Sequence, residues 1–315
     1  MARSSYRCRM ASDDTSTDLY LGIDGGGTAC KARICDSEGH ILAEATTGPA
    51  NTTLGIERCF GEIRRAAEQA LEVAGLNAAR ISELRVGAGL AGLNMQREVD
   101  RAHEFPHPYQ SFNARSDAHI ACYGAHGGDD GGIVIVGTGT CIFGLLNGQE
   151  ISLGGRGFVM ADQGSAADLG RRALRHALQA MDGITPYSAL ATAIAGRFDN
   201  QPDKMVVWSE TAESAGYGRF ARSVFDAAEE GDEIAGKLIA QSAEDVALLI
   251  DALPARGIEN ICLVGGMAEA ITPFLPERCG QYLKPKQGDA LSGALMLARN
   301  PGIQFSTGGQ EVQRG

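Results

Sequence analysis

Short apolar runs separated by glycine-rich or polar turns recur along the first part of the chain. Residues 19–23 are apolar, residues 30–36 alternate between polar and apolar positions, and residues 41–46 follow a polar turn. Runs of this length with period-two alternation predict β-strands, and the glycines between the first two runs predict a tight turn. We therefore predict an antiparallel three-stranded meander at the start of the ordered chain.

The same pattern returns near the middle of the chain. The apolar run 131–136 leads into a Gly/Thr turn at 137–140, and alternating runs follow at 141–146 and 151–153. Two meanders that each begin with an apolar strand and a glycine turn indicate an internal duplication at the scale of a domain. The hypothesis is an α/β protein built from two duplicated halves with a cleft between them.

Helical spacing and further apolar runs predict other elements. Apolar residues from Phe60 to Ala74 share one face of a helix that ends at Gly75, and a long helix covers 232–253 before Pro254. A further helix is predicted at 118–125. Three more strands are predicted at 84–90, 112–116 and 261–264.

Composition narrows the class of function. The chain has 315 residues, with 28 Lys and Arg against 39 Asp and Glu, so its formal net charge is −11. A protein this acidic lacks the concentrated basic face that nucleic-acid binding requires. No run approaches the roughly 18 apolar residues that span a membrane, and we predict neither a membrane span nor a secretory signal. Residues 1–18 are predicted to be a disordered lead-in, and residues 301–315 a loose tail.

The eight cysteines show no metal-ligand spacing. None forms a Cys-x-x-Cys pair, and most lie in apolar or Gly/Ala-rich runs, where a free Cys behaves as a small hydrophobic residue. Because reduced thiols are typical of the cytosol, a cytoplasmic location is predicted.

The glycine turn after the first strand is a candidate anion site. Three consecutive glycines let backbone N–H groups approach an anion closely, and a carboxylate at the strand end suits Mg²⁺ bound through water. The alternative is a hairpin turn that needs glycine only for its backbone conformation. The candidate residues are Asp24, Gly25, Gly26, Gly27, Thr28 and Lys31.

Two later glycine turns extend this hypothesis. Thr138 and Gly139 occupy the equivalent turn of the second half, so two anion-binding turns facing each other would hold a polyphosphate from both sides. Gly265 and Gly266 follow a strand and precede a helix, where a flat adenosine group could lie close to the backbone. The alternative for this third turn is a glycine required by tight strand–helix packing.

Asp117 is the candidate reactive carboxylate. It stands at the end of the strand 112–116 and opens a helix, which is where clefts of α/β proteins place reactive groups. The alternative is a plain helix N-cap, because Asp is a favoured capping residue. Both roles are compatible.

The three turns, in this order and at these separations, resemble the phosphate and adenosine motifs of the actin, sugar kinase and heat-shock chaperone ATPase superfamily. The intervening segments resemble the N-acetylglucosamine kinase-like family, of the BadF/BadG/BcrA/BcrD ATPase type, and within it the bacterial glucosamine kinases most. The likeness covers residues 19–300. Its segments are GPANTTLG (48–55), SDAHIACYGAHGG (116–128), GGRGFVMADQGSAADLG (154–170), DGITPYSAL (182–190), ICLVGGMAEAI (261–271) and KPKQGDALSGALMLA (284–298).

The resemblance implies a fold and an activity. The fold is two duplicated ribonuclease H-like, or actin-like ATPase, domains, with residues 19–117 plus 288–300 in the first and 118–287 in the second. A helical connection near 118–128 and the last helix, 289–299, would form a hinge. The activity is transfer of the ATP γ-phosphoryl group to the 6-hydroxyl of glucosamine, with Mg²⁺ as cofactor and a homodimer as the usual assembly.

The resemblance also implies residue roles. Thr28 and Thr138 would contact ATP phosphates, with Gly25, Gly26 and Gly139 as backbone donors and Gly265 and Gly266 near adenosine. Asp24 would position Mg²⁺, and Asp117 would accept the proton of the sugar hydroxyl. Carboxylates in a pocket of low dielectric favour a cationic amino sugar, although an N-acetylated sugar could use them as hydrogen-bond acceptors. The implied sugar-binding residues are Asn51, Asp117, Thr140, Cys141, Gly155, Arg156, Gly157 and Asp162.

Three positions depart from the pattern of the bacterial glucosamine kinases that the chain resembles. Thr140 replaces a Ser, Ala166 replaces a Gly, and Gly157 stands where some relatives have an acidic residue. The last change affects the expected contacts to the sugar at its anomeric and C2 positions. The phosphate turns are unaffected.

Alternatives from three classes remain beside the glucosamine kinase. One is a kinase for N-acetylglucosamine or another hexose. Another is an ATP-driven activator of a partner reductase, which would hold an iron–sulfur cluster, although Cys122 and Cys141 do not lie in the glycine loop such activators use. The third, a sugar-sensing repressor, lacks room for a helix-turn-helix in residues 1–18.

Overall fold

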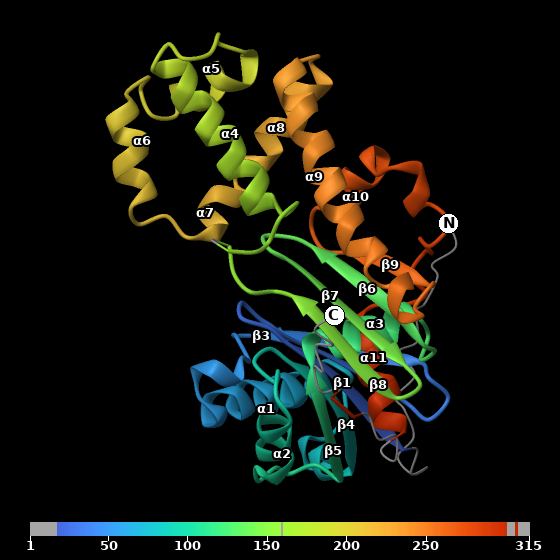
Figure 1. The fold of residues 1–315 in the computed structure, drawn as a ribbon. Helices are drawn as coiled ribbons and strands as arrows, with labels where there is room; N and C mark the ends of the chain where they lie inside the picture. Colours follow the sequence, from blue (N-terminus) through green and yellow to red (C-terminus); the bar gives the residue numbers. More distant parts are fainter. Residues whose placement is uncertain (1–17, 159, 301–305, 308–315) are drawn as a thin grey trace, which may run out of the picture.

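The computed structural model describes residues 18–158, 160–300 and 306–307 (Figure 1). Most of the predicted lead-in and tail lies outside these residues. Within the described part of the chain, no helix combines the length and the apolar character needed to cross a bilayer. The seven cysteines of the described residues are free thiols, as predicted.

The first sheet has five strands in the order β3-β2-β1-β4-β5. The predicted meander is confirmed, because β1 pairs antiparallel with β2 and β2 pairs antiparallel with β3. Strand β4 lies parallel to β1, and β5 lies parallel to β4. The strands are β1 (Leu19–Gly25), β2 (Cys30–Cys35), β3 (Ile41–Thr47), β4 (Leu84–Leu90) and β5 (Ser111–Ser116).

The second sheet, in the order β10-β8-β7-β6-β9, repeats the first four strands of this topology but, within the described residues, has β10 beside β8 in place of a strand equivalent to β5. Strands β6, β7 and β8 form the antiparallel meander, and β9 lies parallel to β6 as β4 lies parallel to β1. The predicted duplication is therefore present, and in both sheets the glycine turn joins the first two strands. The strands are β6 (Gly131–Val136), β7 (Thr140–Leu146), β8 (Gln149–Gly154), β9 (Ile261–Val264) and β10 (Ser306–Thr307).

Helices cover both sheets. Helix α1 packs on β2 and β3, and α2 packs on β5. Helices α4 to α9 gather at the far end of the second sheet (Figure 1). Their bounds are α1 (Ile56–Val73), α2 (Gln96–Glu104), α4 (Ala166–Met181), α5 (Ala189–Gly196), α6 (Pro202–Ser209), α7 (Ser214–Gly218), α8 (Ala221–Glu229), α9 (Glu233–Asp251) and α10 (Ala268–Ile271). Short 3₁₀ helices cover Thr52–Leu54, Ala78–Glu83, Pro254–Arg256, Thr272–Phe274 and Glu277–Cys279.

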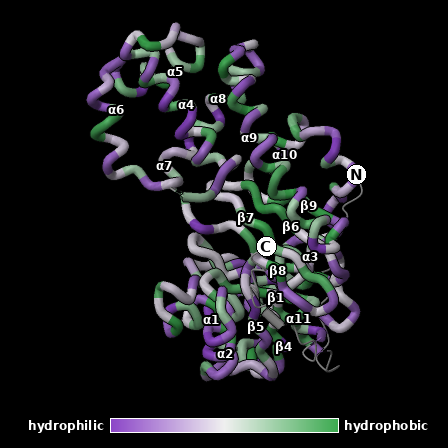
Figure 2. The backbone as a smooth tube through the Cα atoms, in the orientation of Figure 1, coloured by the Kyte–Doolittle hydropathy of each residue, from purple (hydrophilic) through white to green (hydrophobic). Residues whose placement is uncertain are grey.

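Successive residues of β6 face different cores. Val134 and Val136 belong to the core formed with helices α4, α5, α8 and α9, whereas Ile133 belongs to the core formed with α3 (Asp117–Ala125) and α11 (Ala290–Arg299). Side chains alternate between the two faces of a strand, so a sheet buried on both faces needs a continuous apolar run. Figure 2 shows this apolar colour along β6 and β9.

Helices α3 and α11 cross between the two sheets (Figure 1). Helix α11 packs against α3 and also against β1 and β4 of the first sheet. Glycines allow this close approach, because a Cβ at Gly87 would collide with the backbone oxygen of Ala294, and a Cβ at Gly293 with that of Ile120. The last helix of the chain is thus part of the packing of its first sheet.

Candidate active site

The carboxyl ends of β1, β4 and β5 lie side by side. Gly25 is in register with Leu90, and Leu90 is in register with Ser116. Neighbouring strands are about 4.8 Å apart, so the glycine turn after β1 and the start of α3 are about 10 Å apart across this edge. Asp24, the residue before Gly25, and Asp117, the residue after Ser116, therefore lie at the same edge of the first sheet.

Asn51 joins the same edge. The N–H of Ala50 donates to Gly26 O at 3.1 Å, and the N–H of Thr52 donates to Ala91 O at 3.0 Å, so the loop lies over the ends of β1 and β4. Asn51 Oδ1 accepts hydrogen bonds from the N–H and the hydroxyl of Thr53. Its side-chain amide group faces Gly27, where an added Cβ would lie 3.9 Å from Asn51 Nδ2.

The first glycine turn differs in part from the prediction. The N–H of Gly26 donates to Ala29 O at 2.9 Å, so the predicted donation from Gly26 to a phosphate does not hold in this conformation. Gly25 is required for packing, because a Cβ there would lie 2.7 Å from Leu90 Cδ2 and 2.8 Å from Ala50 O. Gly27 and Thr28 are exposed at the tip, where an anion can reach them.

The second and third glycine turns are neighbours. Ile135 pairs with Val264, so the turns that follow β6 and β9 leave adjacent strands. The N–H of Met267 donates to Val136 O at 2.9 Å, and the N–H of Gly137 donates to Gly139 O at 2.9 Å. Thr138, Gly265 and Gly266 are exposed there. The predicted phosphate and adenosine turns of the second half thus form one surface.

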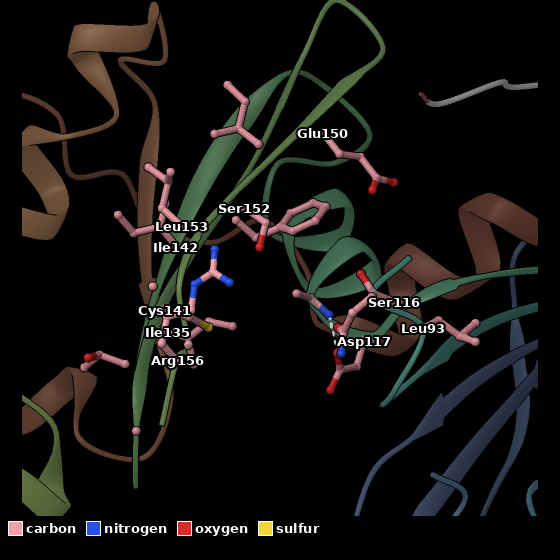
Figure 3. A pocket seen from close by; sticks show the side chains of 18 of the residues that line it. Leu93, Ser116, Asp117, Ile135, Cys141, Ile142, Glu150, Ser152, Leu153 and Arg156 are labelled. Carbon is pink, nitrogen blue, oxygen red and sulfur yellow. Dashed lines mark hydrogen bonds between the residues drawn. The ribbon is translucent and has the colours of Figure 1, made fainter. Parts of the chain in front are cut away.

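A cavity of about 1570 Å³ lies between the carboxyl end of β5 and the meander of the second sheet. Figure 3 shows Ser116 and Asp117 on one wall, with Cys141, Leu153 and Arg156 on the facing wall. The predicted residues that line it are Asp117, Thr138, Gly139, Thr140, Cys141, Gly155, Arg156, Gly157 and Asp162.

The remaining predicted residues lie outside the wall of this cavity. They are Asp24, Gly25, Gly26, Gly27, Thr28, Lys31, Asn51, Gly265 and Gly266. The two Gly/Thr turns predicted to hold a polyphosphate from both sides are therefore not gathered into a single cavity in this structure.

Asp117 is the first residue of α3 and not its N-cap. The cap is Ser116, whose Oγ accepts the N–H of His119 at 3.1 Å. Asp117 Oδ1 accepts the N–H of Ala118 at 2.8 Å. Burial raises the pKa of the Asp117 carboxyl above its usual range, although the Ala118 hydrogen bond opposes this shift. Asp117 lines the cavity.

Burial and neighbouring charges shift the pKa of Asp24. Burial raises the pKa of its carboxyl, Lys31 lowers it, and the charges of Asp117 and Asp289 raise it further. Lys31 is paired with Asp24 in the register of β1 and β2. Among the described residues, no three His, Cys, Asp or Glu side chains are grouped so that they could hold a metal ion without other ligands. A single carboxylate suits a cation that takes its remaining ligands from water and phosphate.

A hydrogen bond connects Asp162 to Thr140, at the end of the second glycine turn. The N–H of Thr140 donates to Asp162 Oδ1 at 3.2 Å, and a Cβ at Gly139 would lie 2.8 Å from Asp162 Oδ2. The Thr140 hydroxyl donates to Gln163 O at 3.0 Å, so its proton is used within the protein. Asp162 has a left-handed backbone, with φ of 66°, and its side chain is held against the second glycine turn.

Cys141 lies near both cavity carboxylates. Burial raises the pKa of its thiol to about 11, and the charges of Asp117 and Asp162 contribute to this shift. The thiol is therefore protonated at neutral pH.

Sequence reasoning missed several polar residues of the cavity. Arg115 precedes Asp117 by two residues, Asn94 follows β4, and Glu150 and Ser152 lie on β8. The strand was predicted at 151–153, which left Glu150 in the turn. The alternation of Glu150, Ser152 and Gly154 along the observed strand would have placed these residues on one face.

The sequence profile of the BadF/BadG/BcrA/BcrD ATPase family matches residues 21–298. Glucosamine kinase GspK of Vibrio cholerae is 39% identical over 284 residues, which make up 90% of this chain and 97% of that protein. N-acetyl-D-glucosamine kinase of Dictyostelium discoideum is 26% identical over 255 residues, which make up 76% of this chain and 80% of that protein.

Solved structures give the same fold. A crystal structure described as a candidate N-acetylglucosamine kinase, from Chromobacterium violaceum, has a TM-score of 0.80 at 32% identity and covers 90% of this chain and 100% of its own. The ROK hexokinase of Thermus thermophilus has a TM-score of 0.55 at 19% identity and covers 89% and 97%. The predicted fold of two duplicated actin-like domains is confirmed.

Proposed function

We propose a function from the premise that this chain belongs to the BadF/BadG/BcrA/BcrD ATPase family, as its motifs predicted. The protein is an ATP-dependent amino-sugar kinase that phosphorylates the 6-hydroxyl of glucosamine. The relative that matches 90% of the chain at 39% identity is a glucosamine kinase. The observation that carries the proposal is the cavity in which Asp117 faces the second glycine turn and the loop 155–157.

Asp117 is the proposed base. Its carboxylate accepts the proton of the sugar hydroxyl as that oxygen attacks the γ-phosphorus, and the bond from phosphorus to the β-phosphate oxygen breaks. The raised pKa of the buried carboxyl supports this role, because a stronger base holds the proton more firmly once transfer is under way.

The glycine turns are the proposed nucleotide site. Thr28 and Thr138 are exposed at the tips of equivalent turns in the two sheets and would contact ATP phosphates. Gly139 would add a backbone donor, and Gly265 with Gly266 would border adenosine. Since Thr28 lies outside the cavity that contains Thr138, we propose that the two halves close about the crossing of α3 and α11 when both substrates bind.

Asp24 is the proposed residue for Mg²⁺. The ion would neutralise phosphate charge when bound, and Asp24 fits it because its carboxylate lies at the end of β1, next to the exposed glycine turn. Lys31, paired with Asp24 in the strand register, would orient that carboxylate and add positive charge near the phosphates.

The sugar site is proposed between the loop of Asn51, at the ends of β1 and β4, and the facing wall of the cavity. Asn51 keeps its amide group for a sugar hydroxyl, and Gly155, Arg156 and Gly157 surround the substrate from the loop after β8. Asp117 and Asp162 place two carboxylates near Cys141, and these are the groups that would bind the ammonium group of glucosamine. Thr140 and Cys141 would contact the sugar through their backbone or side-chain surface.

Substrate preference is tested by one coupled assay. Purified protein with MgATP is compared on glucosamine, N-acetylglucosamine and glucose, and the expected order of kcat/KM places glucosamine first. A preference for N-acetylglucosamine would instead support the second candidate, which is favoured by the names of the Dictyostelium and Chromobacterium proteins. No phosphoryl transfer to any of the three sugars would contradict the kinase proposal.

The base is tested by Asp117→Asn. We expect kcat to fall by about 10²-fold or more while ATP binding, measured by calorimetry, is retained. Asp203→Asn is the matched control, because Asp203 also lies in the first turn of a helix but is exposed on α6. Turnover near that of the unaltered protein in Asp117→Asn would exclude Asp117 as the base.

The family resemblance also supports a homodimer located in the cytoplasm, where ATP is plentiful and the free thiols stay reduced. Light scattering coupled to gel filtration tests the dimer, since a mass near 33.0 kDa would indicate a monomer.

A further inference from the structure

A buried pair formed by a cavity residue, Glu150, and His119 has no part in the function proposed above. His119 Nδ1 lies 2.7 Å from Glu150 Oε1, and the exposed fractions of the two side chains are 0% and 14%. His119 lies on α3, two residues after Asp117, whereas Glu150 lies on β8 of the second sheet. Figure 3 shows Glu150 pointing towards α3. The pair therefore joins the second sheet to the helix that begins with Asp117.

The imidazole is held in a fixed orientation. Burial lowers the pKa of His119, although Glu150 opposes this shift, so the ring is neutral at neutral pH and donates Nδ1–H to the carboxylate. Hydrogen bonds to a charged acceptor are short and strong. The ring also packs against Phe143, with centroids 5.8 Å apart and an angle of 63° between the ring planes.

Arg115 is the third charged group here. It lies on β5, two residues before Asp117, and lines the cavity. Burial lowers the pKa of Arg115 and the charge of Glu150 opposes this shift, while the charge of Arg115 lowers the pKa of His119. Glu150 thus interacts with residues on both sides of Asp117 in the sequence.

Glu150 is also close in sequence to the proposed sugar loop. Strand β8 ends at Gly154, and Gly155, Arg156 and Gly157 follow directly. Movement of β8 against α3 would change the separation between this loop and Asp117. Proton transfer needs the base within hydrogen-bond reach of the hydroxyl, about 2.6–3.2 Å, so this separation matters for turnover.

We propose that His119 and Glu150 are positioning residues, which hold the start of α3 against β8 and thereby set the separation between Asp117 and the sugar loop. This inference rests on the proposed function, in which Asp117 is the base and the loop binds sugar. In this proposal both side chains act through Asp117 and the loop, not on the substrate directly.

The test separates positioning from stability. His119→Phe keeps an aromatic ring against Phe143 but removes the Nδ1–H donor. We expect kcat to fall about tenfold, because small displacements of a catalytic group are costly. The KM values for glucosamine and MgATP are expected to stay within about twofold, since the binding groups are unchanged. His119→Asn places an amide N–H near the position of Nδ1 and is expected to restore most of the lost kcat.

His126→Phe is the matched control. His126 is the second buried histidine of this segment, at the C-cap of α3, and its Nε2 lies 2.9 Å from Gly132 O. We expect its replacement to lower the unfolding temperature as much as His119→Phe does, with kcat unchanged. Glu150→Gln, which keeps the shape but weakens the acceptor, is expected to lower kcat to a smaller extent.

Two results would overturn the inference. An unchanged kcat in both His119→Phe and Glu150→Gln would show that the pair serves stability alone, and so would equal losses of kcat in His119→Phe and His126→Phe. The unaltered protein is assayed first on glucosamine. Absence of turnover there overturns the proposed function, and the positioning role with it.

Discussion

Asp117 experiences two opposing local effects. As the first residue of α3 it lies where backbone N–H groups favour a negative charge, and it accepts one of them from Ala118. Burial acts in the other direction and is the larger effect, so the pKa of the carboxyl is raised. Burial thus makes the charged form of this residue, the proposed base, less stable than it would be in water.

This cost gives a stability prediction for Asp117→Asn. A carboxyl whose folded pKa is raised adds stability below its unfolded pKa, near 3.9, and loses it as pH rises through the folded value. Asn remains neutral and can keep the Ala118 hydrogen bond. We therefore expect the variant to unfold about 2 °C higher than the unaltered protein at pH 7.5 in thermal scans, with a smaller difference towards pH 4.

The exposed Asp203→Asn variant should show no such gain. A lower unfolding temperature for Asp117→Asn than for the unaltered protein at pH 7.5 would contradict the raised pKa.

At the scale of elements, the glycine turns differ in whether their glycines have room for a side chain. At Gly25 and Gly139 an added Cβ would lie too close to neighbouring protein atoms, whereas an added Cβ at Gly266 would meet no atom within 4 Å. The open space beside Gly266 is next to the second glycine turn and is exposed. A substitution at Gly266 can therefore test the proposed nucleotide site without disturbing the packing of the protein.

Gly266→Ala is expected to raise the KM for ATP several-fold, because the methyl group would occupy space proposed for adenosine. The unfolding temperature should be unchanged, since the protein itself has room for the methyl group. Steady-state kinetics and thermal scans check both expectations. Gly61→Ala on α1, which also has open space, is the control and should leave KM unaltered. Equal KM values in both variants would place adenosine elsewhere.

The strands were the most predictable elements. The run 84–90 was predicted with its observed bounds, because an apolar segment between polar residues marks a buried strand. Helix α2 was not predicted, since its sequence is mostly polar and its two buried residues, Val99 and Ala102, give little periodicity. Strand β10 was also missed, because its two residues, in a segment predicted to be a loose tail, pair through backbone groups that no side-chain pattern marks.

The sequence predicted those candidate residues that lie at the carboxyl ends of strands. Asp117 was identified in this way. The N-cap of α3, however, is Ser116, because the sequence alone does not show which of these two adjacent residues caps the helix. His119 lies in an otherwise apolar helix, where a buried histidine is indistinguishable from a core residue until its partner on a distant strand is known. Pairings across 31 residues depend on tertiary structure.

At the scale of the whole molecule, the crossing of α3 and α11 connects both sheets. Gly124 and Gly293 allow the two helices to approach until backbone atoms touch. Arg33 on β2 adds two hydrogen bonds to Asp289 at the N-cap of α11, at 2.8 and 2.7 Å. Burial would raise the pKa of the Asp289 carboxyl, but these contacts hold it well below its usual range. The first sheet and the last helix are therefore joined by charge as well as by packing.

Gly293→Ala is expected to destabilise the whole protein by about 1–3 kcal/mol, because its Cβ would collide with the backbone oxygen of Ile120. Urea unfolding followed by fluorescence measures this loss. Gly236→Ala is the control: it lies on α9 with no atom near its Cβ, and it should stabilise by up to about 1 kcal/mol. A stability of Gly293→Ala equal to that of the unaltered protein would mean that the crossing is loosely packed.

The return of α11 to the first sheet has a consequence during protein synthesis. The face of β1 and β4 that α11 covers emerges from the ribosome about 200 residues before α11 does. At translation rates of about 5–20 residues per second, that face stays exposed for about 10–40 s until α11 is synthesised. The nascent chain is most open to premature association in this interval, and shortening the gene at its 3′ end would make the exposure permanent.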